Sequence, residues 1–244
     1  MRVAAADYAD PASLDAAFAG AEQVLIVSVV EGDRVALHRN AIEAAERAGV
    51  RHVVYTSAPY ADTTSMLLAA DHRGTEEVLA ASGLTVTVLR NAWYVENYTG
   101  RVDTLREHGL VGAAGEGRVS IALRREYAEA AAAVLLDPAE RGRVHELGGE
   151  PVTLEQVAAA ISAATGETIT YTDLPVEGFR DVLAGSGMPD PLPTIFADVD
   201  RAIRDGEPGR RPRRAHRIGR PPPDAARRRG ARGAAGLTPV GGGP

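Results

Sequence analysis

The residues best suited to chemistry lie in one short stretch, NAWYVEN at 91–97. It follows the apolar, branched run 85–90, which is typical of a buried β-strand. Ligands of open parallel sheets bind beyond the carboxyl ends of the strands. Amide, aromatic and carboxylate groups at such a place suit a pocket for a polar molecule beside a flat one. The alternative is that Trp93 and Tyr94 are core aromatics, each with one polar group.

Hydroxyl side chains lie near the ends of two further apolar runs. Ser28 is near the end of QVLIVSVV (23–30), and Thr56 and Ser57 end HVVYTS (52–57). We expect these hydroxyls at the same edge of the sheet, on the floor of a ligand site. Alternatively, they only bond to neighbouring loops.

The composition excludes several classes of enzyme. The chain has no cysteine and no lysine, since all 27 basic residues are arginine. Thiolate nucleophiles, zinc–thiolate sites, Schiff bases and the P-loop are therefore excluded. The six histidines lack metal-binding spacing, so no metal site is expected, and we predict His38 and His72 to be surface or packing residues.

Strand and helix patterns alternate regularly over residues 23–90. The predicted strands are 23–30, 52–57 and 85–90, and the predicted helices are 33–49 and 69–83. Such alternation with short connections predicts an α/β, doubly wound parallel sheet.

The pattern is less regular after residue 95. We predict helices at about 97–107, 125–136, 175–186 and 191–204, and strands at 118–122, 143–147 and 168–172. Thr153 and Gln156 form a capping-box pattern for a helix that stops at Gly166. These later elements predict a smaller α+β C-terminal lobe.

The charge is distributed unevenly along the 244 residues. Residues 1–205 carry 17 arginines against 31 acidic residues, which disfavours nucleic acid as a partner. Residues 206–244 carry 10 arginines against 2 acidic residues and are dominated by Arg, Gly, Pro and Ala. That composition predicts a disordered tail, although a basic arm and a frameshifted end remain alternatives. With neither a long apolar run nor a signal-peptide pattern, we expect a cytoplasmic protein that does not bind membranes.

Four segments together resemble a known family. They are ADYADPASLDAAFAG, HRNAIEAAERAGVRHVVYTSA, LRNAWYVENY and LVGAAGEGRVS, which occur in this order, and the resemblance covers about residues 3–205. The chain resembles the type 2 NAD(P)H:quinone oxidoreductases, which are atypical short-chain reductases close to the NmrA-like proteins. The resemblance implies a Rossmann-like fold, NADP or NAD as cofactor, and a quinone as the small-molecule substrate. It leaves the oligomeric state open.

The resemblance also assigns roles to individual residues. It places Asp7 near the adenine, Thr56 and Ser57 below the nicotinamide, and Arg124 near a phosphate, whereas Ser28 is a cofactor-binding candidate by its position at a strand end. It implies that the nicotinamide half is lined by Asn91, Ala92, Trp93, Tyr94, Val95 and Glu96. Tyr94 and Asn97 would be hydrogen-bond donors in catalysis. For Asp7 a turn or helix cap, and for Arg124 a solvated helix start, remain alternatives.

A segment that the family carries at its start is not found in this sequence. The family begins with a strand, a glycine-rich turn, a helix and a second strand, and GAAGEG at 112–117 comes too late to replace that turn. We therefore expect a partial Rossmann-like sheet without its first βαβ unit, in which strand 23–30 has an apolar edge. The predicted parts are an incomplete NAD(P)-binding domain (1–150), a substrate-side lobe (151–205) and the tail (206–244).

The absence of lysine bears on the reaction. Reducing a ketone leaves an alkoxide whose conjugate acid has a pKa near that of water, about 15.7, and most short-chain dehydrogenases meet it with a Tyr–Lys pair. Reducing a quinone leaves a phenolate with a pKa of about 10, which needs roughly 8 kcal/mol less anion stabilisation. A lysine-free site thus favours quinones. A non-catalytic, dinucleotide-binding redox sensor is one alternative. Impaired activity, or none, is the other, because the glycine-rich turn is not found in the sequence.

Overall fold

Local sequence signals set the helix ends. The computed structural model describes residues 3–100, 102–207 and 213–214. Thr153 and Gln156 form the predicted capping box of α7 (Leu154–Thr165), which ends at Gly166 with φ 75°. This cap and this left-handed glycine satisfy backbone groups that helix ends leave unpaired.

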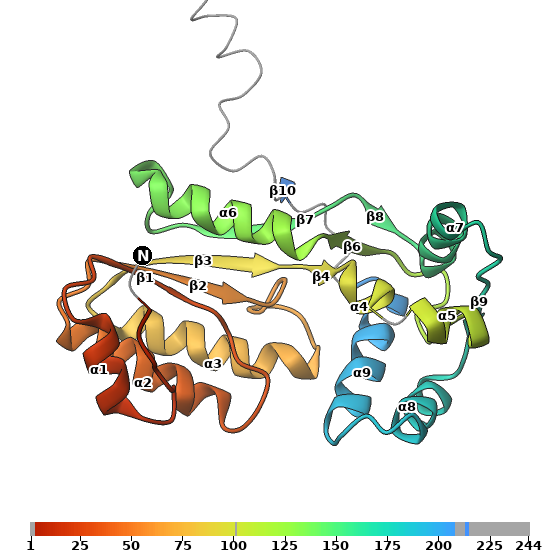
Figure 1. The fold of residues 1–244 in the computed structure, drawn as a ribbon, viewed down its shortest axis with the longest axis horizontal. Coiled ribbons are helices and arrows are strands. Elements are labelled where there is room, and N and C mark those ends of the chain that lie inside the picture. Colours follow the sequence, from red (N-terminus) through yellow and green to blue (C-terminus); the bar gives the residue numbers. More distant parts are fainter. Residues whose placement is uncertain (1–2, 101, 208–212, 215–244) are drawn as a thin grey trace, which may run out of the picture.

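A five-stranded parallel sheet forms the larger lobe (Figure 1). Its strand order is β1-β2-β3-β7-β10, with parallel pairing throughout. The strands are β1 (Gln23–Ile26), β2 (His52–Ser57), β3 (Thr85–Asn91), β7 (Val144–Gly148) and β10 (Arg213–Arg214).

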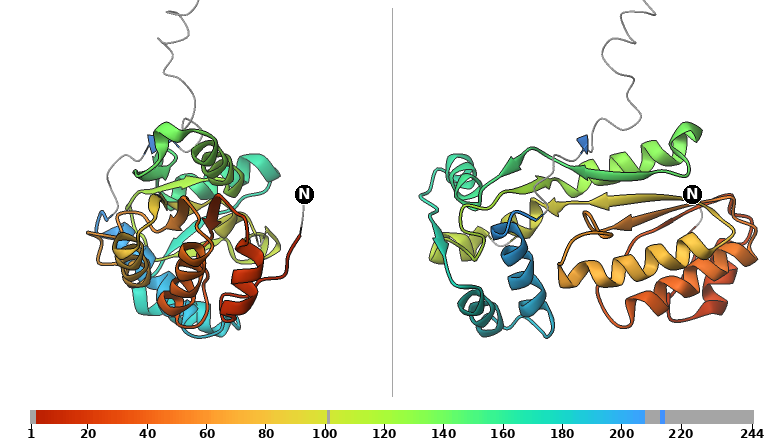
Figure 2. Two further views of the ribbon diagram at one scale, coloured as in Figure 1. Left: turned by 90° about the vertical axis from the view of Figure 1, so that its left-hand side faces the viewer. Right: turned by 180° about the vertical axis from the view of Figure 1, so that it is seen from behind.

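Helices cover both faces of this sheet, as Figures 1 and 2 show. One face carries α1 (Pro11–Phe18), α2 (Arg34–Arg47) and α3 (Leu67–Ala81), and the other carries α6 (Arg124–Leu136), which is followed by the 3-10 turn η1 (Pro138–Glu140). The predicted doubly wound α/β class is confirmed.

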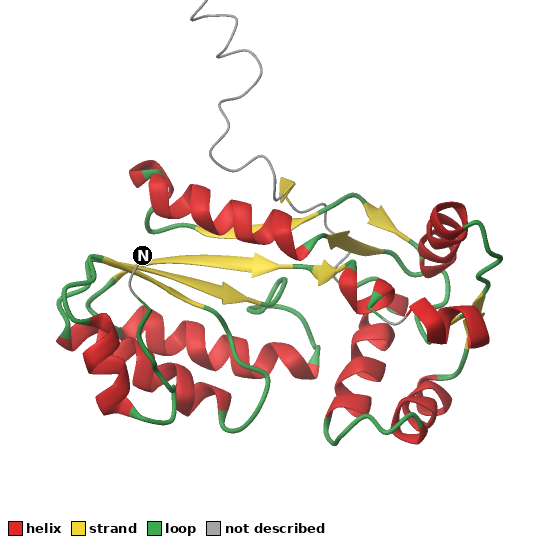
Figure 3. Cartoon of the chain, viewed as in Figure 1, coloured by secondary structure: helices red, strands yellow, loops and turns green. Residues whose placement is uncertain are grey.

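The smaller lobe is built from short strands and five helices of the described chain, seen together in Figure 3. Its strands pair as β4-β6-β8 and β5-β9. Its elements are β4 (Trp93–Tyr94), α4 (Glu96–Thr99), α5 (Val102–His108), β5 (Leu110–Gly112), β6 (Val119–Ala122), β8 (Pro151–Val152), α7, β9 (Tyr171–Asp173), α8 (Val176–Gly185) and α9 (Leu192–Arg204).

A shared apolar core holds the smaller lobe together. It packs Leu105, Leu110 and Val119 against Leu154 and Ile203. The core therefore combines chain segments from before and after residue 150. The domain boundary at that residue stays a prediction.

The first sheet strand is shorter than predicted. It ends at Ile26 because Ser28 N donates to Thr56 Oγ1 and Val29 N donates to His38 Nε2 instead of to a neighbouring strand. Within the described residues β1 pairs only with β2, and Leu25 and Val27 are 36% and 56% exposed. The predicted apolar edge is confirmed.

Two other predictions need correction. The helix predicted at 97–107 is divided into α4 and α5, because the chain leaves the helix at Gly100, the C-cap of α4. The strand predicted at 168–172 begins only at Tyr171, since Ile169 N donates to the Ser162 hydroxyl. The predicted disordered tail lies outside the described residues, apart from 206–207 and 213–214.

Candidate functional site

The carboxyl ends of β2 and β3 and the loop after β1 enclose a cavity of about 280 Å³. We name it the strand-end cavity. It brings together nine of the predicted site residues: Ser28, Thr56, Ser57, Asn91, Ala92, Trp93, Tyr94, Asn97 and Arg124. Val95, Glu96 and Asp7 are not among the residues that line it.

Three hydroxyl side chains on the floor of the strand-end cavity, those of Ser28, Thr56 and Ser57, take part in hydrogen bonds. Ser28 N donates to Thr56 Oγ1 at 2.9 Å, and Thr56 Oγ1 donates to Ser28 Oγ at 3.3 Å. Ser57 Oγ donates to Glu76 Oε1 at 2.6 Å. Thr56 thus bonds to the loop after β1, whereas Ser57 bonds to helix α3, and a ligand contact by any of these hydroxyls stays a prediction.

Arg34 is a wall residue that sequence reasoning missed. It is buried, lines the cavity, and donates from Nε to Val29 O at 2.7 Å. Its NH2 group lies 2.9 Å from His72 Nε2, so this ring nitrogen accepts. Nothing in its neighbourhood in the sequence distinguishes Arg34 from an ordinary surface arginine near a helix start.

His38 and His72 are buried packing residues, in agreement with the prediction that they are surface or packing residues. Burial, followed by the nearby Arg34 charge, lowers the pKa of His38 to about 4 and that of His72 to about 3. Both rings are therefore neutral at pH 7, which agrees with His38 Nε2 accepting from Val29 N. They hold the loop after β1 in place.

A cluster of ion pairs around the buried Arg90 contacts the strand-end cavity through one of its lining residues, Ser57. Arg90, 7% exposed, donates to Glu76 at 2.6 Å and to Glu146 at 3.0 Å, and pairs with Asp62 at 2.8 Å. Glu76 also accepts from Ser57, so the cluster fixes the hydroxyl at the end of β2. We refer to these residues as the Arg90 cluster.

Asn91 has an unsatisfied group at the cavity. Its side chain is buried, and its Oδ1 has no hydrogen-bond partner among the described residues. A buried acceptor without a partner costs about 1–3 kcal/mol. Position and cost together point to a ligand that donates a hydrogen bond there.

The rest of the 91–97 stretch mainly joins the two lobes. Val95 N donates to Ala122 O, and both carboxylate oxygens of Glu96 accept from Arg124 N at 3.0 and 3.1 Å. Glu96 thus caps α6. The Arg124 guanidinium lies 5.6 Å from the centre of the Tyr94 ring, a cation–π contact.

Asp7 lies in a separate hollow of about 550 Å³, together with Tyr8 and Ser28. Its Oδ1 accepts from Ala9 N at 2.8 Å, which makes it a turn residue. Because Ser28 lines both hollows, a long ligand could extend from one to the other.

The GAAGEG segment has a structural role. Asp200 of α9 accepts from Ala113 N, and Arg204 Nε donates to Ala113 O. A Cβ atom at Gly117 would collide with the carbonyl oxygen of Ile203. The glycines therefore let α9 approach the turn, in agreement with the expectation that this segment does not replace the phosphate-binding turn.

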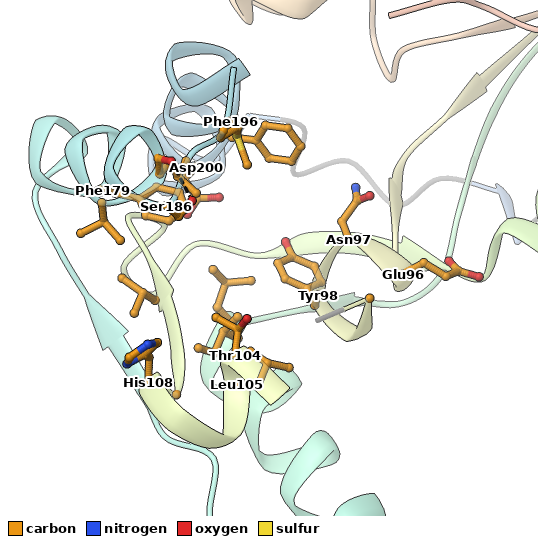
Figure 4. Close-up of a pocket in the computed structure, with 18 of the residues that line it drawn as sticks. Glu96, Asn97, Tyr98, Thr104, Leu105, His108, Phe179, Ser186, Phe196 and Asp200 are labelled. Carbon is orange, nitrogen blue, oxygen red and sulfur yellow. Dashed lines mark hydrogen bonds between the residues drawn. The ribbon is translucent and has the colours of Figure 1, made fainter. Parts of the chain in front are cut away.

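A second cavity of about 700 Å³ lies in the smaller lobe (Figure 4). We name it the lobe cavity. It shares Trp93, Asn97, Arg124 and Phe196 with the strand-end cavity, so the two adjoin. The rings of Trp93 and Phe196 meet edge to face at the junction, with centroids 5.6 Å apart.

The strand-end cavity fits the nicotinamide end of a dinucleotide. Its hydroxyl floor is polar, and the unpaired Asn91 oxygen could accept from a carboxamide. Among the described residues, no group of three acidic or histidine side chains could hold a metal ion, and no helix is long and apolar enough to cross a membrane.

Comparisons with known proteins show which family the chain resembles in sequence. The model of the NmrA-like family matches residues 1–203. Quinone oxidoreductase 2 of Escherichia coli is 43% identical over 209 residues, which are 84% of this chain and 73% of that protein.

Solved structures with the same fold include two reductases with a bound cofactor. The E. coli NADPH-dependent quinone oxidoreductase QOR2 with NADPH has a TM-score of 0.80 at 42% identity and covers 84% of this chain and 74% of its own. The Citrobacter sp. triphenylmethane reductase with NADP(H) has a TM-score of 0.82 at 30% identity and covers 91% of this chain and 81% of its own.

Proposed function

This chain belongs to the NmrA-like family, and from that premise we propose that it is an NADPH-dependent quinone oxidoreductase. The observation that carries the proposal is the pair of adjoining cavities. One has a polar floor with an unpaired amide oxygen, and the other has aromatic and aliphatic walls. NADPH would supply a hydride and the quinone would accept it.

The residues of the chain would act mainly by positioning. Holding two reactants in contact distance can supply much of a barrier reduction without any covalent step. Asn91 would orient the nicotinamide amide, and the hydroxyl floor of Ser28 and Thr56 would lie below it. Asp7 and Arg124 would contact the adenine and a phosphate. Ser57, whose hydroxyl donates to Glu76, would lie on the same floor, and Ala92 and Trp93 would form the wall. Val95 and Glu96, which bond to Ala122 and Arg124, would hold this stretch in place.

Tyr94 and Asn97 are the proposed donors to the oxygen that gains negative charge. Both line the strand-end cavity, and Asn97 also lines the lobe cavity and is exposed. Oriented donors stabilise a developing anion. A phenolate needs less of this help than an alkoxide, which agrees with the absence of lysine from the chain.

The division of labour between lobes is also a proposal. Residues 1–150 would contain most nucleotide contacts, and residues 151–205 would contribute α8 and α9 to the acceptor side. The 93–122 segment would contribute to both sides, because Trp93 and Asn97 lie at the junction.

Steady-state oxidation of NADPH by a benzoquinone tests the function. We expect turnover by the 244-residue chain, and a fall of about 10-fold or more in kcat for Asn97→Ala or Tyr94→Phe, as for loss of an oriented donor. Dinucleotide binding without turnover would favour a redox sensor instead. Unchanged turnover in both variants would refute the two assigned roles.

A further inference from the structure

The lobe cavity has walls suited to a flat apolar ring. Many of its side chains come from α4, α5, α8 and α9, and Figure 4 shows several of them around the cavity. The apolar ones include Leu105, Phe179, Leu183, Met188 and Phe196. Aromatic and branched walls of this kind bury ring faces and exclude water.

Among the polar side chains that line the lobe cavity, Tyr98 and Asp200 carry buried polar groups. Tyr98 Oη is buried and has no hydrogen-bond partner among the described residues. Asp200, 6% exposed, lines the same cavity, and its Oδ2 accepts from Ala113 N at 2.7 Å. Each is a buried polar group that the fold keeps inside an apolar space at a free-energy cost.

The space around Asp200 depends on a glycine. A Cβ atom at Gly112 would lie 2.8 Å from Asp200 Oδ2 and 2.9 Å from Leu154 Cδ1. A larger residue there would push the carboxyl group away. Asp200 therefore occupies a place that the neighbouring strand β5 leaves open for it.

We propose that the lobe cavity is the acceptor site, and that Tyr98 and Asp200 form its polar end and select ring acceptors with a second oxygen atom. This inference rests on the proposed function. The end of the acceptor that takes the hydride would lie beside Trp93, Asn97 and Phe196, where the two cavities adjoin. The other carbonyl oxygen would accept from the Tyr98 hydroxyl.

A quinone meets these requirements better than a simple hydrocarbon or a monoketone. Its ring matches the apolar walls, and its second carbonyl oxygen provides the partner that Tyr98 Oη lacks. A site with a buried donor discriminates strongly against analogues that leave the donor unpaired. The polar end should therefore affect selectivity among acceptors more than the affinity for NADPH.

The single tryptophan of the chain, Trp93, makes a direct test possible. It lines the lobe cavity, so saturable quenching of its fluorescence by 1,4-naphthoquinone, without NADPH, measures acceptor binding. We expect Tyr98→Phe to raise the quinone Kd about 5- to 10-fold, as for the loss of one hydrogen bond. Naphthalene has no oxygen, so its affinity, measured by displacement of the quinone, should be the same in Tyr98→Phe as in the wild type.

Tyr171→Phe is the matched control. Tyr171 packs on the core of the same lobe, but its hydroxyl is already bonded to Asp173 and it is not among the residues that line the lobe cavity. We expect an unchanged quinone Kd. An unchanged Kd in Tyr98→Phe, or an equal rise in both variants or for naphthalene, would overturn the inference.

The result is separable from the proposed function. Fluorescence reports acceptor binding without turnover, whereas NADPH oxidation reports the reaction. Turnover with no effect of Tyr98→Phe on the quinone Kd or KM would leave the reductase standing and refute the polar end.

Discussion

Asn91 combines burial with an oxygen that has no partner, which an ordinary core residue avoids. We predict that Asn91→Leu, which keeps the number of side-chain heavy atoms, leaves the unfolding free energy unchanged or raises it by about 1 kcal/mol, because an unpaired acceptor is removed. The same change should weaken NADPH binding by about 5- to 10-fold, measured by calorimetric titration.

A second amide provides the control for Asn91. Gln156 accepts from Thr153 N in the cap of α7, far from the strand-end cavity in the chain. Gln156→Leu should lower stability and leave the NADPH affinity unchanged. If Asn91→Leu behaved in the same way, Asn91 would be a structural residue only.

Asp200 should make acceptor binding depend on pH. Burial raises its pKa to about 6, Ala113 N opposes that shift, Asp173 adds to it and Arg204 opposes it. Below that pH the carboxyl group is protonated and can donate to a carbonyl oxygen. Above it the carboxylate faces that oxygen, so the KM for a neutral quinone should rise as the pH rises through about 6.

The variant Asp200→Asn tests this dependence, because an amide does not titrate and can still accept from Ala113 N. Its quinone KM should be flat between pH 5 and 8, in the range where the wild type changes. The other charged or titratable groups that face Asp200 or the lobe cavity are Glu96 and Tyr98 on α4, His108 on α5, Arg124 on α6, Tyr171 and Asp173 on β9, and Arg204 on α9. A pH profile that persisted in the variant would show that Asp200 is not the group responsible.

Among the helices and strands, the sequence predicted those features that are set by residues close together in the chain. The apolar runs of β2 and β3 and the cap of α7 are local signals, and the structure confirms them. Caps supplied from distant segments were not predictable. Asp198 Oδ2 accepts from Leu67 N at the head of α3, across 131 positions, and Glu96 caps α6 across 28.

In the candidate site, too, residues marked by local signals were predicted and residues that depend on contacts between distant segments were not. Strand-end positions placed Thr56, Ser57 and Asn91 at one cavity, because parallel strands end at one edge of the sheet. Arg34, Tyr98 and Asp200 were missed. Their importance arises only when α2, α4 and α9 pack together, and no spacing in the sequence marks them.

The contact between α9 and the GAAGEG turn yields a prediction about stability. Gly117→Ala should lower the unfolding free energy by about 1–3 kcal/mol, because the added methyl group meets the Ile203 carbonyl oxygen and the turn or α9 must move. Gly185→Ala, at the end of α8 with open space around it, should change little. Urea denaturation of both variants measures the difference, and equal effects would contradict the close approach.

At the scale of the whole molecule, the Arg90 cluster joins β2, α3, β3 and β7 directly below the strand-end cavity. We predict that Arg90→Met lowers stability at pH 7 by about 3–5 kcal/mol, since Glu76 and Glu146 would be left without their cation. Exposed Arg51, which pairs with Glu22 on the surface, is the control, and Arg51→Met should cost less than about 1 kcal/mol.

The pH dependence of the Arg90 variant follows from the carboxylates that remain. Burial already raises the pKa of Glu146, while Tyr60 N and Arg90 oppose that shift. Without Arg90 the folded-state pKa of Glu146 should lie further above its unfolded value, so stability is lost as the pH rises through it and regained as it falls. Urea titrations from pH 7 to pH 5 should therefore show the deficit of Arg90→Met shrinking, whereas a constant deficit would mean that packing of the arginine stem, and not its charge, holds these four elements together.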